Sequence, residues 1–199
     1  MNVVVFHGSA RRKGDTDTLA EHFLRGLNEE GQHEVTHFVA IDMNIAHCRA
    51  CMECMSGSGC MIQDDMQAVY PALRDANVVV LATPMFWGDM TSQLKTLFDR
   101  LEAVVTHEYF GNRDFVLLIG YRHYFGSMIE WLARITVGFG SRCHTIACQT
   151  FDPVTKSDRP IHFMPDKLAA ATQLGQQIAT TSVESAPSTD LIRTPTSEP

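Results

Sequence analysis

The 199-residue sequence predicts an α/β fold, in which helices cover both faces of a five-stranded parallel sheet. Two observations lead to this prediction. Short apolar runs alternate with amphipathic segments of helical period along most of the chain. The clearest run, residues 78–83, is apolar at almost every position, as expected of a strand buried on both faces. Right-handed crossovers and the modest chain length favour the doubly wound strand order 2-1-3-4-5.

Each expected element has a start or stop signal. The five strands are expected at residues 3–6, 34–41, 78–83, 115–119 and 144–150, and Pro84 is expected to end the third. Gly31 can stop the first helix, Asp64 or Asp65 can cap the second, and Thr91 or Ser92 can cap the third. The five helices are expected at residues 18–29, about 66–73, 91–105, 128–137 and 165–179.

Residues 1–180 are therefore expected to form one domain, and residues 181–199, rich in Ser, Thr, Pro and Glu, a disordered tail. The chain carries 16 basic and 23 acidic residues, a net charge of −7. This balance argues against a nucleic-acid surface and against a polybasic membrane patch. The first apolar run is far too short for a signal peptide, so a cytoplasmic protein is expected.

The loop after the first strand has the composition of a phosphate site. Ser9, Thr16 and Thr18 offer hydroxyl groups, Arg11 offers a guanidinium, and the following helix presents free N–H groups. The loop lacks the glycine patterns of dinucleotide-binding sites and of P-loop NTPases. A terminal monophosphate fits this composition, and an ordinary strand-to-helix turn is the alternative.

The loop after the third strand is expected to lie beside the first loop, since both follow central strands. It offers apolar faces and backbone N–H groups to a flat heterocycle. Phe86 and Trp87 are adjacent, so only one of them need stack on such a ring. Their alternative role is to cover the core.

Three segments together resemble one known family. GSARRKGDT at residues 8–16, DDM at 64–66 and ATPMFWGDMTSQLK at 82–95 are similar to motifs of the NADPH-dependent FMN reductase family, closest to its iron-sulfur flavoprotein branch. The resemblance implies a flavodoxin-like fold and bound FMN. It implies that the phosphate is bound by Ser9, Arg11, Thr16 and Thr18. It also implies that the isoalloxazine ring is lined by Pro84, Met85, Phe86, Trp87 and Gly88.

Two positions depart from the family pattern. Ala10 replaces a proline, and Asp15 replaces an asparagine. The charge of Asp15 opposes a neighbouring phosphate unless it faces Arg12 or Lys13.

The segment between the second strand and the second helix carries four cysteines, Cys48, Cys51, Cys54 and Cys60, in the spacing C-x2-C-x2-C-x5-C. This spacing resembles the compact motif of the iron-sulfur flavoproteins, which implies a [4Fe-4S] cluster near FMN. A dithiol–disulfide pair, a zinc site with thiolate ligands and unreactive thiols are the alternatives. Cys143 and Cys148 lie five residues apart around the last expected strand, would point to opposite faces of the sheet, and are expected to be buried.

An aromatic loop at residues 120–126 follows the fourth strand. Tyr121, with Trp87, is the candidate contact for the nicotinamide of NAD(P)H. Arg122 or His123 is a candidate to stabilise negative charge on the reduced flavin. A surface or interface loop is the alternative.

Together these features predict an FMN-dependent NAD(P)H oxidoreductase that gives electrons to a quinone, a flavin, a metal complex or a redox protein. No catalytic side chain is named, because the flavin would carry the hydride transfer. An electron carrier with FMN and [4Fe-4S] and a non-enzymatic redox sensor are the alternatives. The resemblance also implies a homodimer or homotetramer.

Overall fold

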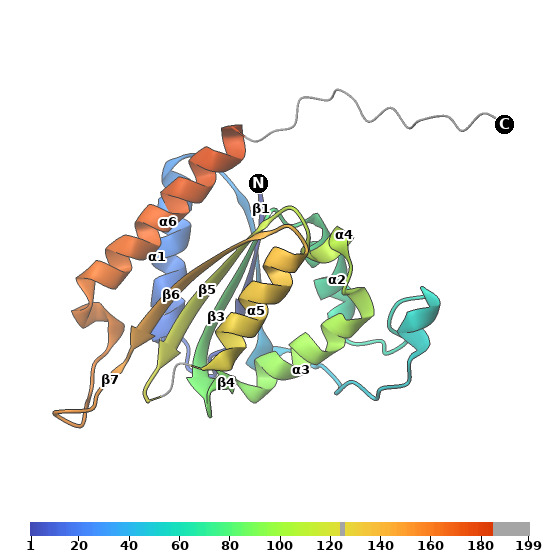
Figure 1. Ribbon diagram of the computed structural model, residues 1–199, viewed down its shortest axis with the longest axis horizontal. Coiled ribbons are helices and arrows are strands. Elements are labelled where there is room, and N and C mark those ends of the chain that lie inside the picture. The colour runs from blue at the N-terminus through green and yellow to red at the C-terminus, as the bar shows by residue number, and fades with distance from the viewer. Residues whose placement is uncertain (124–125, 185–199) are drawn as a thin grey trace.

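A computed structural model describes residues 1–123 and 126–184 and shows a twisted parallel sheet between two layers of helices (Figure 1). The strands run in the order β2-β1-β3-β5-β6. This arrangement is equivalent to 2-1-3-4-5 and confirms the predicted flavodoxin-like fold. The five strands are β1 (Asn2–His7), β2 (Glu34–Val39), β3 (Val78–Phe86), β5 (Asp114–Tyr121) and β6 (Arg142–Gln149).

One face of the sheet packs against α1 (Asp15–Glu29) and α6 (Pro165–Glu184). The other face packs against α2 (Met66–Asp75), α3 (Ser92–Arg100) and α5 (Ser127–Gly138), with the short helix α4 (His107–Phe110) beside them. Shorter elements complete the fold: the strands β4 (Asp89–Met90), β7 (Phe151–Asp152) and β8 (Ser157–Asp158), and single 3-10 turns at Ala40–Asp42, Glu53–Ser56, Leu101–Val104 and Ile161–Phe163.

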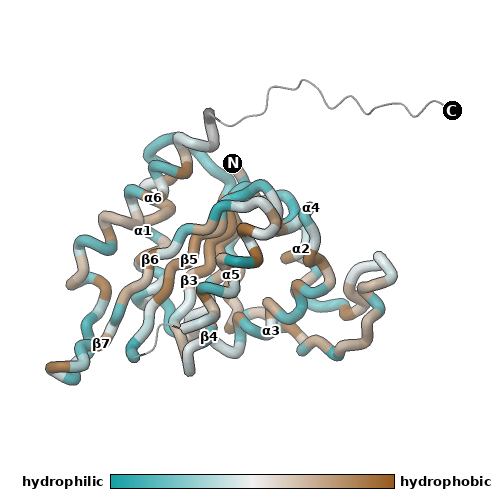
Figure 2. Tube along the Cα trace, in the orientation of Figure 1, coloured by the Kyte–Doolittle hydropathy of each residue, from teal (hydrophilic) through white to brown (hydrophobic). Residues whose placement is uncertain are grey.

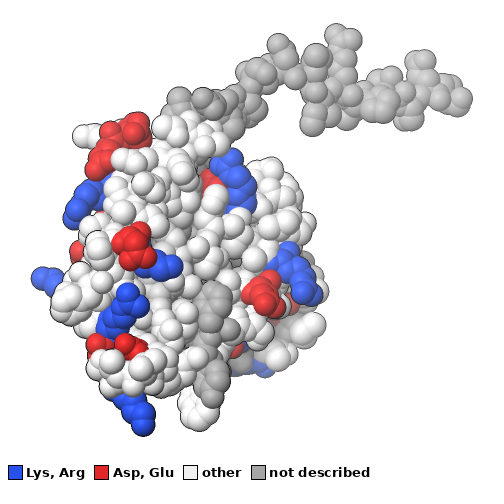
Figure 3. Space-filling view, turned by 60° about the vertical axis from the view of Figure 1, so that its left-hand side comes forward, with Lys and Arg blue, Asp and Glu red and all other residues white. Residues whose placement is uncertain are grey.

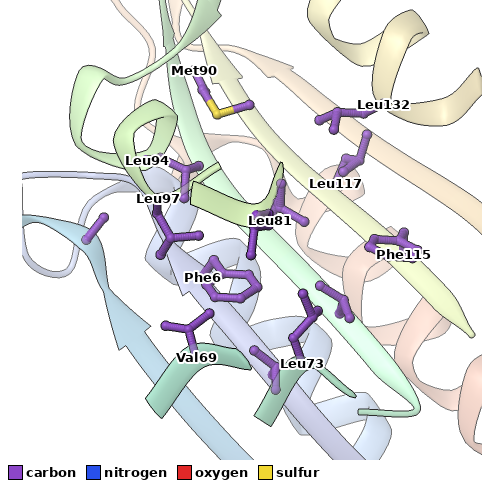
Figure 4. Packing of buried hydrophobic residues seen from close by; sticks show 14 of the residues in the cluster. Phe6, Val69, Leu73, Leu81, Met90, Leu94, Leu97, Phe115, Leu117 and Leu132 are labelled. Atoms are coloured by element: carbon purple, nitrogen blue, oxygen red, sulfur yellow. The ribbon is translucent and has the colours of Figure 1, made fainter. Parts of the chain in front are cut away.

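Two apolar cores follow from the alternation of side chains along the strands. Val3 and Val5 contribute to the core under α1 and α6, whereas Val4 and Phe6 contribute to the core on the opposite face. Figure 4 shows Phe6 of the second core among leucines of neighbouring strands and helices, and the hydropathy trace shows the apolar centre of the sheet (Figure 2). Cys143 and Cys148 contact opposite cores, as predicted; Cys148 is fully buried and Cys143 partly so.

The sequence predicts that Pro84 ends the third strand, and this prediction is wrong. β3 continues to Phe86, and Pro84 pairs in register with Gly120 of β5. β1 stops pairing with β3 at Ala82, so the side of β3 that faced β1 is open beyond that residue. In a strand, residues two apart direct their backbone N–H groups toward the same neighbouring strand. Ala82 faces β1, so Pro84 faces the same side, which is open at that point. The missing N–H of Pro84 therefore removes no hydrogen bond between strands.

Two helix boundaries also differ from the predictions. The α-helix expected at residues 91–105 ends at Arg100 and tightens into a 3-10 turn, Leu101–Val104. α6 continues to Glu184, beyond the expected domain end at residue 180. Residues 185–199 of the expected tail lie outside the described part of the chain.

Among the described residues, no helix has the length and apolar character needed to cross a membrane. On the face shown in Figure 3, the basic and acidic side chains of these residues are interspersed.

Candidate functional site

The loops after β1 and β3 meet at the edge of the sheet where the strand order reverses, at the bottom of Figure 1. The Gly8 N–H donates to the Ala82 carbonyl at 2.8 Å, and the buried Thr91 hydroxyl donates to the Gly8 carbonyl at 2.7 Å. A Cβ atom at Gly8 would lie 2.5 Å from Thr83 Oγ1 and 2.9 Å from Leu94 Cδ2. Glycine is therefore required for this close approach of the two loops.

The N-terminus of α1 is open toward this edge. Gly14 occupies the N-cap position, where no side chain caps the helix. Ser9 and Thr16 are only 8% and 3% exposed, and the Thr16 hydroxyl has no hydrogen-bond partner among the described residues. Free helix N–H groups beside the unpartnered hydroxyl of Thr16 form a suitable site for a phosphate. The residues present therefore fit the phosphate group of FMN.

The other two predicted phosphate ligands are placed differently. The Thr18 hydroxyl donates to the Gly14 carbonyl at 3.1 Å, so it is already engaged within the first turn of α1. The Arg11 side chain is exposed, whereas its backbone N–H donates to Ser9 Oγ at 3.1 Å. Ser9 Oγ in turn donates to the Arg11 carbonyl at 3.0 Å. Ser9 and Thr16 are thus the buried pair among the four predicted ligands, and of these two only Thr16 has a hydroxyl without a partner among the described residues.

Asp15 does not face Arg12 or Lys13, which were its expected partners. Its carboxylate accepts a hydrogen bond from the Ile161 backbone N–H at 2.7 Å, at the 3-10 turn before α6. Arg12 instead pairs with Asp42, after β2. The carboxylate of Asp15 therefore has its own partner and ties α1 to the segment that leads to α6.

The loop after β3 is a tight hairpin between β3 and β4. Met85 pairs with Met90 and Phe86 with Asp89, which leaves Trp87 and Gly88 as the two turn residues. Both have positive φ, +54° and +80°, as two-residue hairpins of this type require. Trp87 is fully exposed, whereas Met85 is buried. An exposed tryptophan at such a turn contributes nothing to the core, which excludes the role of a core lid.

A cavity of about 240 Å³ joins this hairpin to the aromatic loop after β5. It is lined by Met85, Phe86, Trp87, Gly88, Arg122 and His123. The fold thus brings together four residues predicted for the flavin ring and the two candidates from the aromatic loop. Pro84 lies at the base of the hairpin within β3, and Tyr121 ends β5.

Arg122 and His123 are held by a hairpin that the sequence did not reveal, β7–β8. Arg122 pairs with Asp158, and its guanidinium carbon lies 4.5 Å from the ring centre of Phe151. The His123 ring meets the same phenylalanine edge-on, with ring centres 4.7 Å apart. The β7–β8 hairpin therefore shapes this side of the cavity.

The four clustered cysteines lie between Ala40–Asp42 and α2, in the cyan loop at the right of Figure 1. Cys48 and Cys51 are exposed, and Cys54 and Cys60 are partly buried. Within residues 1–123 and 126–184, no three Cys, His, Asp or Glu side chains are placed to hold one metal ion. In a [4Fe-4S] cluster each thiolate binds a different iron, so the [4Fe-4S] site on these four cysteines stays a prediction.

Arg100, which the sequence analysis missed, anchors this segment. Its guanidinium is almost fully buried, donates to Asp64 Oδ2 at 2.6 Å and to the Ala46 carbonyl at 2.8 Å, and lies 3.4 Å from Cys60 Sγ. The Nε atom of Arg100 is buried without a partner in the described structure. Arg100 thus ties both ends of the cysteine segment to α3.

This network favours the ionised forms of two side chains, the Cys60 thiolate and the Asp64 carboxylate. Burial acts against the Cys60 thiolate, but the Ile62 backbone N–H and Arg100 outweigh burial and lower the pKa of Cys60. Burial likewise opposes ionisation of Asp64, yet its hydrogen bonds from Arg100 and two backbone N–H groups hold its pKa below the ordinary value. Cys60 is therefore in a different environment from the exposed Cys48 and Cys51.

A second, larger cavity of about 810 Å³ lies between α3 and α5. It reaches Asp89 and Met90 of the hairpin at one point and His47 and Cys48 of the cysteine segment at another. Its walls include apolar side chains of both helices, among them Trp131. The cavity therefore adjoins both predicted ligand sites.

The family comparison matches residues 1–145 to the NADPH-dependent FMN reductase family. The chain belongs to this family. The resemblance predicted from three short motifs is thus confirmed over most of the sheet, and the family is one of flavin-dependent oxidoreductases.

Two curated relatives and one solved structure illustrate the similarity. An iron-sulfur flavoprotein of Archaeoglobus fulgidus is 36% identical over 107 residues, 54% of each chain. An iron-sulfur flavoprotein of Methanocaldococcus jannaschii is 38% identical over 106 residues, 53% of this chain and 52% of the relative. The matches thus span about half the length of these relatives.

The NAD(P)H:quinone oxidoreductase from Methanothermobacter marburgensis superposes with a TM-score of 0.68 at 18% identity, covering 89% of this chain and 96% of that one. At this identity the superposition shows the shared fold alone.

Proposed function

We propose that this chain is an FMN-dependent NAD(P)H oxidoreductase. The observation that carries the proposal is the open N-terminus of α1, where the buried Ser9 and Thr16 lie next to free helix N–H groups. These groups would hold the phosphate of FMN, and the nearby β3–β4 hairpin would hold its ring.

The hairpin and the aromatic loop would orient the ring. The exposed Trp87 side chain and the backbone of Gly88 border the 240 Å³ cavity, and Arg122 lies on its other side. FMN, when bound, would supply hydride acceptance from NAD(P)H and electron delivery to a quinone, a flavin or another acceptor. The protein's part is to hold the ring at the cavity and to present a cation to its polar edge.

Anaerobic stopped-flow mixing tests this proposal. The FMN-loaded protein is mixed with NADH or NADPH, and the flavin absorbance is followed. We expect bleaching of the oxidised flavin with at least one nucleotide, and slower bleaching for Trp87→Ala. An FMN-loaded protein that stays oxidised with both nucleotides contradicts the reductase function.

A second candidate function is that of an iron-sulfur flavoprotein that carries electrons between proteins. The cysteine spacing and the two relatives of that name favour it. The four thiols lie on one loop whose ends are held by Arg100, and this loop would close around the cluster as the metal binds. Iron and sulfide assays after anaerobic purification decide this: four irons per chain support the carrier, and absence of iron and sulfide contradicts it.

A further inference from the structure

A line of three titratable side chains lies beneath the first loop, outside every motif discussed above. His7, the last residue of β1, bonds through Nδ1 to Asp17 Oδ1 at 2.9 Å and through Nε2 to Nδ1 of His37 at 3.0 Å. Asp17 comes from the first turn of α1 and His37 from β2. The two imidazole rings are stacked, with centres 5.3 Å apart. Three separate elements therefore converge on His7.

The geometry defines which protons this array can hold. An ionised carboxylate only accepts hydrogen bonds, so His7 Nδ1 carries a hydrogen directed at Asp17. When His7 is neutral, its bare Nε2 accepts from His37 Nδ1–H. When His7 gains a proton, Nε2–H donates to a neutral His37 instead. The pair thus holds one additional proton without losing its hydrogen bond, whereas a second would set two N–H groups against each other.

Asp17 connects this array to the phosphate site. It lies between Thr16 and Thr18 in the first turn of α1, so its charge is at the helix end that would receive the phosphate. Burial opposes its ionisation, but His7 and the backbone N–H groups of Lys13 and Gly14 outweigh burial and lower the pKa of Asp17. A phosphate at this helix end would repel the Asp17 carboxylate, and a proton on His7 would offset this repulsion.

Among the described residues, the one ion pair of Asp17 is with His7, and no lysine or arginine pairs with it. Of the elements around His7, β3 presents Ala82 at the paired position, and β2 presents His37. The His37 side chain is exposed by its surface area, but neighbouring atoms partly desolvate its ring, and this desolvation and His7 lower the pKa of His37. The nearby Asp15 is bonded to the Ile161 N–H, and Arg12 is paired with Asp42. In the described structure, the hydrogen-bonding and ionic partners of His7 are therefore Asp17 and His37 alone.

We propose that the Asp17–His7–His37 array couples the binding of a flavin phosphate to the uptake of one proton, which makes His7 a residue that selects FMN over riboflavin. This inference rests on the proposed FMN site. The proton taken up by the histidine pair offsets the repulsion between the Asp17 carboxylate and the flavin phosphate. Riboflavin has no phosphate, so its binding gains nothing from this proton. The array therefore favours the phosphorylated flavin as long as the histidine pair can be protonated.

Calorimetric titration of the flavin-free full-length protein tests the coupling. FMN binding is measured in two buffers of different ionisation enthalpy, which gives the protons taken up, and riboflavin is titrated in parallel. The protons are counted at about pH 7.5, well above the second ionisation of the phosphate, about 6, so that nearly all of the FMN is a dianion. We expect net proton uptake with FMN and none with riboflavin. The FMN affinity should fall about threefold to tenfold between about pH 6.5 and about pH 8.5.

Variants separate this coupling from a structural role of His7. His7→Asn should abolish the uptake and flatten the pH profile. Asp17→Asn should also flatten it, but should tighten FMN binding at high pH, because it removes the opposing charge. If His7→Asn does not fold, His37→Gln is the second variant. It replaces an exposed side chain, so it should fold, and it should reduce the proton uptake. His22→Asn, in the same helix, is the matched control and should behave as wild type.

The outcomes distinguish the two proposals. If wild type and the His22→Asn control bind no FMN at any pH, the proposed FMN site is wrong. If FMN binds but His7→Asn and Asp17→Asn keep the wild-type uptake and pH profile, the proton coupling is wrong and the FMN site stands. Equal uptake with FMN and riboflavin also overturns the coupling.

Discussion

The loop after β1 and the cysteine segment after β2 follow neighbouring strands, but they are held in place in different ways. In the first, the helix N-terminus and the buried Ser9 and Thr16 are fixed by packing on the sheet. In the second, the fold fixes only the ends of the segment through Arg100, and the thiols of Cys48 and Cys51 remain exposed. A site made from backbone N–H groups is formed by the fold itself, whereas a site made from side chains on a long loop needs its ligand to complete it.

The largest expected effect is on the anchor of the cysteine segment. Arg100→Met leaves Asp64 buried without its partner, which should lower the free energy of unfolding by about 3–5 kcal/mol. Urea denaturation measures this loss. The control Arg74→Met removes an exposed ion pair with Asp75 and should leave the free energy of unfolding almost unchanged, because solvent screens exposed pairs. Similar losses for both variants would show that Arg100 is not the anchor.

The same variant has a defined pH dependence. The pKa of Asp64 is lowered in the folded protein, so its ion pair contributes fully above the ordinary aspartate value, about 3.9, and the contribution is lost as the pH falls through the lowered pKa. The difference in free energy of unfolding between wild type and Arg100→Met should therefore become smaller in acid. A gap that stays constant from neutral pH to about pH 2 would contradict the ion-pair explanation.

The next effect concerns the loop after β1. Thr16→Val removes a buried hydroxyl that would bond to a charged phosphate, so FMN affinity should fall by about 1.5–3 kcal/mol, roughly tenfold to a hundredfold. Riboflavin affinity should not change, because riboflavin has no phosphate. Fluorescence titration of both flavins measures this difference. Thr180→Val, whose hydroxyl bonds only within α6, is the control and should bind both flavins as wild type does. Equal losses for FMN and riboflavin would exclude a phosphate role for Thr16.

A smaller effect tests whether the two regions are independent. The double variant Cys48→Ser/Cys51→Ser changes two exposed side chains and should alter the free energy of unfolding by no more than about 0.5 kcal/mol. Its FMN affinity should equal that of wild type, and any iron bound by the wild-type protein should be lost. Loss of FMN binding in this variant would mean that the loop after β1 depends on the cysteine segment.

The smallest expected effect on stability is at the turn of the β3–β4 hairpin. Trp87 is fully exposed and has a positive φ, which asparagine adopts more readily than tryptophan. Trp87→Asn should therefore raise the free energy of unfolding slightly, by about 0.5 kcal/mol, while it slows flavin reduction. Thermal unfolding and stopped-flow mixing measure the two effects. A marked loss of stability would show that Trp87 belongs to the folded core.

Much of the fold follows from local sequence signals. The strands and helices carry their own periodicity, and this is why the strand order could be predicted without any contact information. The continuation of β3 through Pro84 was missed, because it depends on where β1 stops pairing with β3. The β7–β8 hairpin was missed as well, because its strands are only two residues long.

The candidate site was predictable where one short segment supplies it. Ser9 and Thr16 lie in the motif that suggested a phosphate, and Met85 to Gly88 in the motif that suggested a ring. Arg100 lies 36 residues from Asp64 in sequence, so no local pattern pairs them. The partner of Asp15 is 146 residues away, and it is not one of the adjacent cations that the sequence suggested.

Titration of the flavin-free full-length protein with FMN and with riboflavin tests the central claim most directly, that the loop after β1 is a ready phosphate site. FMN should bind at least about tenfold more tightly than riboflavin, since one charge-assisted hydrogen bond alone accounts for that factor. Equal affinities for the two flavins, or no binding of either, would contradict it.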